Sequence, residues 1–395
     1  MANKLNDEDK KKKCKEFEDY LDREKIIIKN PAVFDNAYNP EEIVKRKETY
    51  LLYSEVSDFV NYRNPNNLLL VGLPGTGKTV TVEHIQKKMN NILKEKKIKT
   101  IKINCADKTS NQILSFMIGD VTKLTSDNLL LKKFFSNMEE DCLLILDEID
   151  KARGIQKLLN NLSRPKEVQE DFSKNLSLIL ISNDLNFADS LESYIRSSLK
   201  LKTIYFEPYS KNALTNILKE RISLGFVNDK SITNILIKFI AEKTSSGRRG
   251  DCRIAIDTLF YSAKKAEQDN RDFITERDIT LMFDKSIRQI EQNRIAKLTN
   301  NQLIVLVACS KSKNKSVEDI QEEYLNLSGK MGLKQLKSKS MIFYLLNYLD
   351  MQNLIFREIK TIVKNNIPKK EMLISLKVSE DIIMDEFNKR TLNLT

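Results

Sequence analysis

The sequence predicts an α/β domain with a parallel five-stranded sheet, followed by an all-helical domain and a C-terminal winged helix. The first observation is a series of short apolar runs, from Asn67 onward, that alternate with helix-length segments. Such runs are typical of βαβ units, in which the sheet is buried on both faces. The second observation is that these runs stop after Pro208. The strands expected from them span residues 68–71, 98–104, 142–146, 176–181 and 201–206.

Helical spacing of apolar residues dominates the rest of the chain. Four such stretches predict a small helical domain, and three more precede a short extended pair. Three helices and a two-stranded ribbon are the elements of a winged helix, which lays its third helix in the major groove of DNA. The expected helices span 210–224, 231–244, 251–268, 275–294, 301–311, 316–328 and 335–349, and the extended pair spans 354–363 and 372–378 around a turn at 365–370.

These patterns divide the chain into four parts. A segment rich in both charge signs comes first, and we expect a solvated helix or tail there. The parallel sheet belongs to the second part, the helical domain is the third, and the winged helix is the fourth. The predicted limits are 1–25, 26–208, 209–296 and 297–395.

Composition and charge exclude several classes of protein. Lys and Arg total 66 against 55 Asp and Glu, a formal net charge of +11, which suggests a polyanionic partner because Lys and Arg displace counterions from phosphates. No apolar run approaches the roughly 18 residues that span a bilayer, and the charged N-terminus has no signal-peptide core, so we expect a cytoplasmic location. Five scattered cysteines without C-x-x-C spacing predict reduced thiols. The single histidine, His84, has no metal-ligand cluster around it, which favours a structural or surface role.

A complete phosphate-binding loop follows the first predicted strand. The glycines of such a loop let backbone N–H groups surround a phosphate, and the following helix N-terminus adds positive potential. Lys78 is expected to reach the β- and γ-phosphates of a nucleotide, and the Thr79 hydroxyl to hold Mg²⁺. A chance glycine-rich turn is the alternative, and the strand before and the helix over 78–91 after the loop disfavour it. The pattern G-x-x-x-x-G-K-[ST] is matched in full by Gly72-Leu73-Pro74-Gly75-Thr76-Gly77-Lys78-Thr79.

A second motif, two acidic residues at the end of a predicted strand, is expected to complete this site. The apolar run at 143–146 is followed by Asp147 and Glu148. Asp147 comes at the carboxyl end of its strand and is expected in the Mg²⁺ shell. Glu148 is expected to orient and polarise an attacking water. An acidic strand end can also cap a helix, but beside a complete phosphate loop it favours phosphoryl transfer to water.

Two further polar side chains extend the expected site. Asn183 follows another apolar run, and its amide could contact both the water and the γ-phosphate, although an isolated Asn there is more commonly a turn former. The order of loop, acidic strand and polar-ended strand is the arrangement of the AAA+ ATPases. Arg253 begins a helix after a glycine-rich segment. If it bridged to the γ-phosphate, the lid angle would depend on ATP or ADP; without other information, an ordinary helix-surface Arg is the commoner interpretation.

Several segments resemble those of one known family. They are Tyr38-Asn39-Pro40-Glu41-Glu42 with Arg46, Ile181-Ser182-Asn183-Asp184-Leu185, Phe206-Glu207-Pro208-Tyr209 with Arg221, Gly250-Asp251-Cys252-Arg253-Ile254-Ala255 and Leu345-Leu346-Asn347-Tyr348-Leu349-Asp350-Met351. Over nearly its whole length the chain resembles the archaeal replication initiators of the origin recognition and cell-division-control type. The resemblance implies that Tyr209 and Arg221 contact the nucleotide and that Arg253 contacts its γ-phosphate. It also implies an ATP-switched protein that binds origin DNA and helps recruit or load the replicative helicase, with other initiator subunits as further partners.

Three positions depart from the pattern of that family. The family usually has an Arg where this chain has Tyr194, so Arg196 is the substitute candidate for an Arg that reaches a neighbouring subunit's ATP. Residues 106–123, where the family inserts a DNA-touching helical element, lack an aromatic-basic signature. The predicted turn at 365–370 lacks the family's glycines.

Positive charge concentrates near the C-terminus, where residues 330–377 hold ten basic and three acidic side chains. The first residues of a recognition helix reach base edges, whereas lysines at its margins contact phosphates. Because Lys and Ser discriminate bases weakly, we expect modest sequence preference and strong salt dependence. A solvated basic face on a protein-binding winged helix is the alternative. The expected DNA contacts are Lys334, Lys337, Ser338 and Lys339 on the third helix and Lys364, Lys369 and Lys370 in the wing.

The sequence and the resemblance together predict an ATP-dependent DNA replication initiator that binds origin duplex DNA. ATP or ADP and Mg²⁺ are the expected ligands, hydrolysis is expected to be weak and switch-like, and the protein is expected to associate with the nucleoid. Two alternatives stay open: a signalling or regulatory P-loop ATPase whose winged helix contacts proteins, and a transcription regulator. A clamp-loader subunit is a further alternative, disfavoured because such subunits do not normally end in a winged helix.

Overall fold

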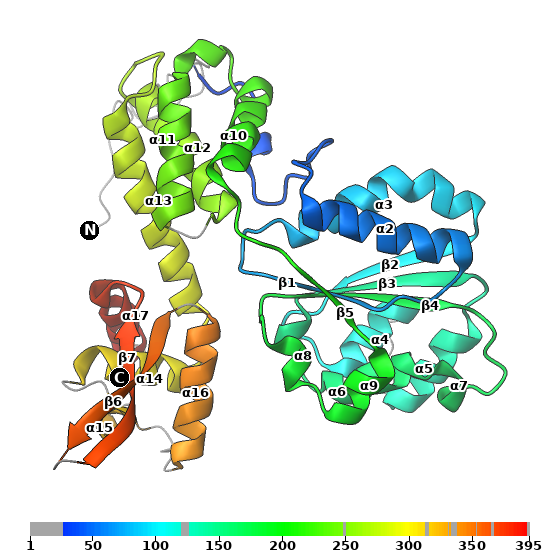
Figure 1. Ribbon diagram of the computed structural model, residues 1–395. Coiled ribbons are helices and arrows are strands. Elements are labelled where there is room, and N and C mark those ends of the chain that lie inside the picture. The colour runs from blue at the N-terminus through cyan, green and yellow to red at the C-terminus, as the bar shows by residue number, and fades with distance from the viewer. Residues whose placement is uncertain are drawn as a thin grey trace, which may run out of the picture. The chain divides into compact units, whose positions relative to one another are not determined.

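The chain divides into two units, one ending at Phe283 and the other beginning at Asp284. The first contains the predicted sheet and helical lid, and the second contains the predicted winged helix (Figure 1). Within the described part of the chain, no helix is long and apolar enough to cross a membrane. The computed structural model describes residues 27–119, 126–247, 250–312, 316–330, 332, 338–352, 354–364 and 367–392.

A parallel five-stranded sheet in the order β2-β3-β4-β1-β5 carries the first unit. This confirms the predicted fold class, and each of the five predicted strands is present. The residues that follow β1, β3 and β4 lie together at the carboxyl edge of three adjacent strands, which is where α/β sheets bind ligands. The strands are β1 (Leu68–Val71), β2 (Ile98–Asn104), β3 (Asp141–Asp147), β4 (Leu176–Ser182) and β5 (Lys202–Tyr205).

Alternation along β1 explains why helices cover both faces of the sheet. Leu68 and Leu70 belong to an apolar cluster with two helices, whereas Leu69 and Val71 belong to a second cluster with the others (Figure 1). Successive strand side chains point to opposite faces, so a continuous apolar run has to be covered on both. The first cluster includes α2 (Lys47–Tyr62) and α3 (Lys78–Glu95); the second includes α4 (Ser110–Ile118), α5 (Asp127–Ser136), α6 (Ile155–Ser163), α7 (Pro165–Val168), α8 (Phe187–Ser190) and α9 (Ser193–Leu199), with the 3₁₀ helix η2 (Ile149–Lys151) after β3.

The lid is a helical domain whose core includes the segment before α2. The backbone N–H groups of Ile27 and Ile28 both donate to Glu267 Oε1 at 2.9 Å. Phe34 packs so closely on Gly225 that a Cβ there would lie 2.3 Å from its ring. The lid helices are α10 (Lys211–Gly225), α11 (Asn234–Gly247), α12 (Cys252–Gln268) and the first part of α13 (Glu276–Ala296), with the 3₁₀ helices η1 (Pro31–Phe34) and η3 (Asp229–Ser231). The rest of α13 follows Phe283 and belongs to the second unit.

Three helices and an antiparallel pair of strands form the second unit, as the sequence predicts for a winged helix. A further helix, α17 (Glu380–Leu392), follows the pair and was not predicted. It shares an apolar cluster with α14 through Ile382, Ile383 and Phe387. The other elements are α14 (Asn300–Lys311), α15 (Val317–Lys330), α16 (Lys339–Met351), β6 (Ile355–Lys364) and β7 (Ile367–Leu376).

The predicted turn between these strands is too long. β6 ends at Lys364 and β7 begins at Ile367, so residues 367–370 belong to a strand and the prediction of a turn over 365–370 is wrong in its second part. Two residues separate the strands, and connections of this length are the commonest in antiparallel pairs. The Asn-Asn sequence at 365–366 would have predicted the shorter connection. Pro368 lies within β7, which is possible because both strands of a two-stranded sheet are edges, where proline is tolerated.

Candidate nucleotide-binding site

The phosphate loop connects β1 to α3 at the carboxyl edge of the sheet. Gly75 and Gly77 have φ values of +77° and +85°, in the left-handed region that favours glycine. Gly77 is the N-cap of α3, so the helix begins at Lys78 and its first backbone N–H groups lack partners within the helix. The Thr76 hydroxyl donates to the Leu73 carbonyl at 2.8 Å, which closes the loop on itself. The loop therefore has the backbone form of an anion site.

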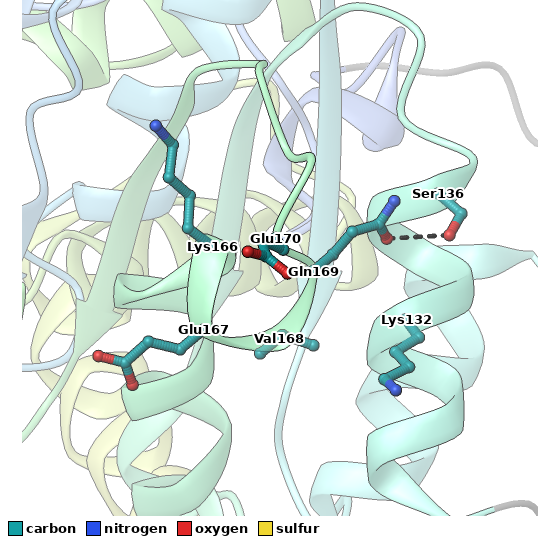
Figure 2. A pocket seen from close by; sticks show the side chains of 7 residues that line it. All are labelled: Lys132, Ser136, Lys166, Glu167, Val168, Gln169 and Glu170. Atoms are coloured by element: carbon teal, nitrogen blue, oxygen red, sulfur yellow. Dashed lines mark hydrogen bonds between the residues drawn. The ribbon is translucent and has the colours of Figure 1, made fainter.

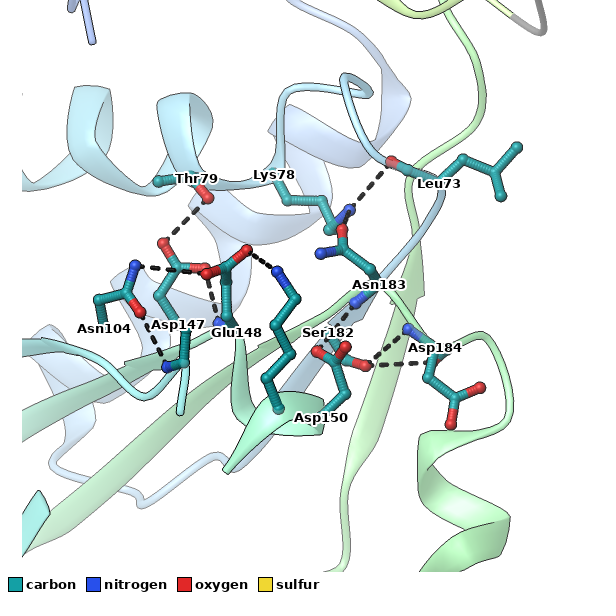
Figure 3. A network of polar contacts seen from close by, with 12 residues as sticks. Leu73, Lys78, Thr79, Asn104, Asp147, Glu148, Asp150, Ser182, Asn183 and Asp184 are labelled. Atoms are coloured by element: carbon teal, nitrogen blue, oxygen red, sulfur yellow. Dashed lines mark hydrogen bonds and ion pairs between the residues drawn. The ribbon is translucent and has the colours of Figure 1, made fainter. Parts of the chain in front are cut away.

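Lys78 is buried and turns back into this loop. Its ammonium donates to the carbonyls of Gly72 and Leu73 at 2.7 and 3.1 Å and to Asn183 Oδ1 at 2.9 Å (Figure 3). Burial lowers the pKa of Lys78 to about 8, and Asp150 and Asp147 oppose this effect. The structure thus brings together two residues that the sequence assigned to the γ-phosphate, Lys78 and Asn183.

Thr79 and Asp147 meet as a pair suited to Mg²⁺. The Thr79 hydroxyl donates to Asp147 Oδ2 at 3.0 Å (Figure 3). Asp147 is buried, and burial raises its pKa while the Thr79 hydrogen bond opposes that rise. A hydroxyl and one carboxylate fit the hard oxygen ligation of Mg²⁺, which commonly takes one or two carboxylates plus substrate phosphates. No described cluster of three or more His, Cys, Asp or Glu residues could hold a metal ion by itself.

Glu148 follows Asp147 at the same sheet edge, in a left-handed conformation with φ of 54°. Its backbone N–H donates to Asp147 Oδ1 at 2.9 Å, while its carboxylate accepts from Lys151 at 2.5 Å and from Asn104 at 3.5 Å. Asn104 was missed in the sequence analysis, although it is the polar end of β2 just as Asn183 follows β4. The same strand-end criterion would have found it. The arrangement holds a carboxylate in place beside the residues suited to Mg²⁺ (Figure 3).

Asp150 fixes the strand end that carries Asn183. Its Oδ1 accepts the Asn183 backbone N–H at 3.2 Å, which links the acidic segment after β3 to the end of β4 (Figure 3). The sequence analysis assigned no role to Asp150. Through this bond Asp150 helps to position the backbone of Asn183, whose side chain contacts Lys78.

Arg253 lies at the start of α12, where the lid meets the phosphate loop. The Cys252 backbone N–H donates to the Gly75 carbonyl at 3.3 Å, so the two segments touch. The Arg253 guanidinium is held by Asp251, with Nε to Oδ1 at 3.0 Å and Nη2 to Oδ2 at 2.7 Å. The structure therefore brings Arg253 to the edge of the loop while pairing it with a lid carboxylate.

Asp257, one turn further along α12, should make the stability of the protein depend on pH. Burial raises its pKa to about 6, and Arg253 opposes the rise. A carboxyl that binds its proton more tightly when folded makes folding stability fall as pH rises through about 4 to 6. We expect Asp257→Asn to raise the free energy of unfolding at pH 7 by about 1 kcal/mol, after allowance for solvent screening, and by less at pH 5. Denaturation at both pH values measures this, with the exposed Asp272→Asn as control; equal gains at both would contradict it.

Tyr209 and Arg46 pack against the phosphate loop from the lid side. The Tyr209 hydroxyl would lie 2.2 Å from a Cβ at Gly77, and burial raises its pKa to about 12. Arg46 stacks 4.2 Å from the centre of the Tyr209 ring and donates to the Thr76 carbonyl at 2.6 Å and the Glu207 carbonyl at 2.8 Å. The resemblance pointed to Arg46 as part of a motif, but it was not included among the site residues. Its contact with the loop backbone is a tertiary one that no local pattern signals.

Arg221 is buried in the lid at α10. Its guanidinium lies 4.3 Å from the centre of the Tyr38 ring, and burial lowers its pKa. Its Nε and Nη1 atoms are buried and have no hydrogen-bond partner among the described residues. Unsatisfied buried donors are costly, so these N–H groups would gain from donating hydrogen bonds to a polar ligand.

The remaining predicted residues fall at several places. Arg196 is exposed on α9 and pairs with Asp189 at 2.9 Å, beside the exposed Tyr194. Lys334 and Lys337 lie outside the described residues. Ser338 is the N-cap of α16 and Lys339 its first residue, paired with Glu318 at 3.3 Å. Lys364 ends β6, whereas Lys369 and Lys370 lie within β7. His84 is buried on α3, and burial lowers its pKa.

A shallow polar pocket lies apart from this site, between α5 and α7 (Figure 2). Ser136 Oγ donates to Gln169 Oε1 at 2.9 Å across it. Its lining contains two lysines and two glutamates, so it carries no excess charge for an ionic ligand. The lining residues are Lys132, Ser136, Lys166, Glu167, Val168, Gln169 and Glu170.

Two protein-family models match the chain. The ATPase family associated with various cellular activities (AAA) matches residues 68–208, and the Cdc6 AAA+ ATPase-type lid domain matches residues 215–281. An ORC1-type DNA replication protein of Methanothermobacter thermautotrophicus is 27% identical over 341 residues, which cover 84% of this chain and 89% of the relative. ORC1-type DNA replication protein 1 of Sulfurisphaera tokodaii is 26% identical over 385 residues, covering 92% and 94%.

Solved structures share the fold along most of the chain. The Aeropyrum pernix ORC1 protein in complex with DNA matches with a TM-score of 0.71 at 23% identity, covering 93% of this chain and 98% of that one. Cdc6p from Pyrobaculum aerophilum matches with a TM-score of 0.57 at 20% identity, covering 92% and 100%. At these identities the likeness establishes the fold.

Proposed function

The chain belongs to the archaeal Orc1/Cdc6 family of AAA+ replication initiators, and on that premise we propose that it is an ATP-dependent switch that binds origin duplex DNA. One observation carries the proposal: residues from the loop, β3, β4 and the lid converge at one sheet edge. Lys78 touches Asn183 there, Thr79 touches Asp147, and Arg253 reaches the loop from the lid.

Each side chain of the site has a task in binding a nucleoside triphosphate. Lys78 and the N–H groups of the loop bind the phosphates, and Tyr209 and Arg221 bind the nucleotide from the lid. Thr79 and Asp147 would hold Mg²⁺, which neutralises phosphate charge. Glu148 orients a water and accepts its proton, while Asn183 holds the γ-phosphate. The tether of Glu148 to Lys151 and Asn104 supports slow, switch-like hydrolysis, because the carboxylate has to leave its partners to act as a base.

The winged helix supplies the DNA contacts in this proposal. Ser338 and Lys339 open α16, the third helix, and the basic residues of the strands and of the preceding segment add charge for phosphates. A winged helix reads the major groove with its third helix, while a wing strand contacts the backbone. We further propose that the DNA-bound protein recruits or loads the replicative helicase, acts with other initiator subunits and is associated with the nucleoid. Arg196 is the candidate Arg for a neighbouring subunit's ATP.

The test of this function is duplex binding over a range of salt concentrations, with ATP and with ADP. We expect affinity to fall steeply with salt and to differ between the two nucleotides, and we expect Arg253→Ala to reduce that difference to less than about twofold. Genomic mapping of the bound DNA should place it at origins. Nucleotide dependence that survives in Arg253→Ala would reject the coupling, and no duplex binding at any salt would reject the initiator function.

A protein-binding winged helix is the second candidate, because one observation favours it. Met341, Phe343 and Tyr344 are exposed on α16, on the helix that would enter the groove. Exposed apolar residues can mark a protein interface as well as contacts with thymine methyl groups. Duplex binding that is absent, or that hardly changes with salt, would favour this candidate. Binding at promoters rather than origins would instead favour a transcription regulator.

A further inference from the structure

Asp251 lies where the lid meets the phosphate loop, and we infer that it is a positioning residue: its carboxylate holds Arg253 until ATP binds and then yields it to the γ-phosphate. The inference rests on the proposed function, because it takes Arg253 to contact the γ-phosphate. It assigns to the lid an anion that competes with ATP for the same guanidinium. Asp251 would then set how strongly the protein prefers ATP to ADP.

The ion pair has the geometry that a phosphate would use. Both oxygens of Asp251 accept from one edge of Arg253, at 3.0 Å from Nε and 2.7 Å from Nη2. Guanidinium groups bind carboxylates and phosphates through this same two-pronged edge. Burial alone would lower the pKa of Arg253, but the hydrogen bond and charge of Asp251 outweigh it and leave that pKa raised. Arg253 therefore has to leave Asp251 before it can bind a phosphate with that edge.

The carboxylate also lies against the phosphate loop itself. A Cβ at Gly75 would lie 1.8 Å from Asp251 Oδ1, so only glycine permits this approach. The side chain of Asp251 is 7% exposed, whereas that of Arg253 is 39% exposed. Asp251, the buried partner, therefore lies next to the loop, whereas the more exposed guanidinium of Arg253 has room to move.

The charges around Lys78 are consistent with such a role for Asp251. Lys78, Arg253 and the N-termini of α3 and α12 all bring positive potential to the loop. Arg253 lowers the pKa of Lys78 and Asp251 raises it, so both lie within electrostatic range of the ammonium. Asp251 balances this potential in the absence of a ligand. A triphosphate supplies its own negative charge and takes over that role.

Asp251→Asn separates this role from a structural one. Asp251 is the N-cap of α12 and accepts the Arg253 backbone N–H at 3.1 Å, and asparagine is an equally good N-cap. We expect the variant to bind a non-hydrolysable ATP analogue about tenfold more tightly while its affinity for ADP stays within about twofold. In an Arg253→Ala background we expect the gain to disappear, because no guanidinium remains to be released. Calorimetric titration of wild type, both single variants and the double variant measures all four ratios.

Three results would overturn the inference. They are equal changes for the two nucleotides, a gain that persists without Arg253, and the same gain in the exposed control Asp272→Asn. If Asp251→Asn fails to fold, Asp251→Ser keeps a capping oxygen without the charge and should show the same rise in the ratio. Failure of the wild type to bind ATP would reject the proposed function as well. If Arg253→Ala binds ATP more weakly than the wild type does, but Asp251→Asn has the same ratio of ATP to ADP affinity as the wild type, this inference alone is rejected.

Discussion

Replacing Lys78 with methionine is expected to lower the affinity for ATP by about 100-fold or more. Methionine keeps the length of the side chain but removes the buried charge that faces the loop. In the structure that charge is shared among the carbonyls of Gly72 and Leu73 and the Asn183 side chain. Phosphate oxygens are stronger acceptors for an ammonium than neutral carbonyls, so the interaction lost is mainly one that forms with the nucleotide.

The folding stability of Lys78→Met should change much less than its ATP affinity, because two effects oppose each other. Burial lowers the pKa of Lys78 to about 8, which shows that holding the charged form there is costly, and methionine removes that cost. The substitution also leaves two loop carbonyls without their donor, which costs stability. Calorimetric titration and thermal denaturation measure the two quantities. Lys87→Met, at an exposed position of the same helix, is the control; equal losses of ATP affinity in both variants would contradict the role of Lys78.

Local patterns were sufficient to predict the sheet and the phosphate loop. A strand buried on both faces is mainly apolar, so Leu68–Val71 and Leu176–Ser182 could be located from runs of such residues. The loop is a contiguous motif whose form follows from its own glycines. Because parallel strands end at one edge, the residues after β1, β3 and β4 could be expected to meet, as Lys78, Asp147 and Asn183 do.

Contacts made through the tertiary structure could not be predicted in the same way. Arg46 precedes the sheet, yet its guanidinium holds the Thr76 carbonyl, a pairing that depends on how α2 docks. Asp251 reads in sequence as an N-cap, and only its approach to Gly75 shows that it adjoins the loop. Asn104 is the exception, because the strand-end argument used for Asn183 applies to it equally.

The winged helix was predicted in outline, and its details depended on weaker signals. Helix α17 buries only a few residues against α14, so its apolar pattern is short and its acidic first turn resembles a surface segment. In the strand at Ile367–Leu376 the first isoleucine is followed by proline and two lysines, which are depleted in strands. Pairing with β6 overrides that preference, because the ladder satisfies the backbone of both strands.

Changing Glu148 to glutamine is expected to slow ATP hydrolysis by about 100-fold or more while ATP affinity stays within about threefold. Glutamine has the same shape and still accepts a hydrogen bond from Lys151, but it cannot take a proton from water. The contacts assigned to ATP and Mg²⁺ come from Lys78, Thr79 and Asp147, and none of the described hydrogen bonds of Thr79 or Lys78 involves Glu148. Phosphate release under single-turnover conditions measures hydrolysis, and calorimetric titration measures binding.

The comparison of the two quantities separates the possible roles of Glu148. Glu139→Gln, at an exposed position before β3, removes the same charge and should leave both quantities unchanged. If Glu148→Gln lost affinity and hydrolysis to the same extent, Glu148 would act with Asp147 in holding the metal ion. If hydrolysis were unaffected, the proton acceptor would have to lie elsewhere. To act as the base, the Glu148 carboxylate has to leave Lys151 and Asn104 and contact the attacking water. Removing the Asn104 hydrogen bond should therefore speed hydrolysis rather than slow it.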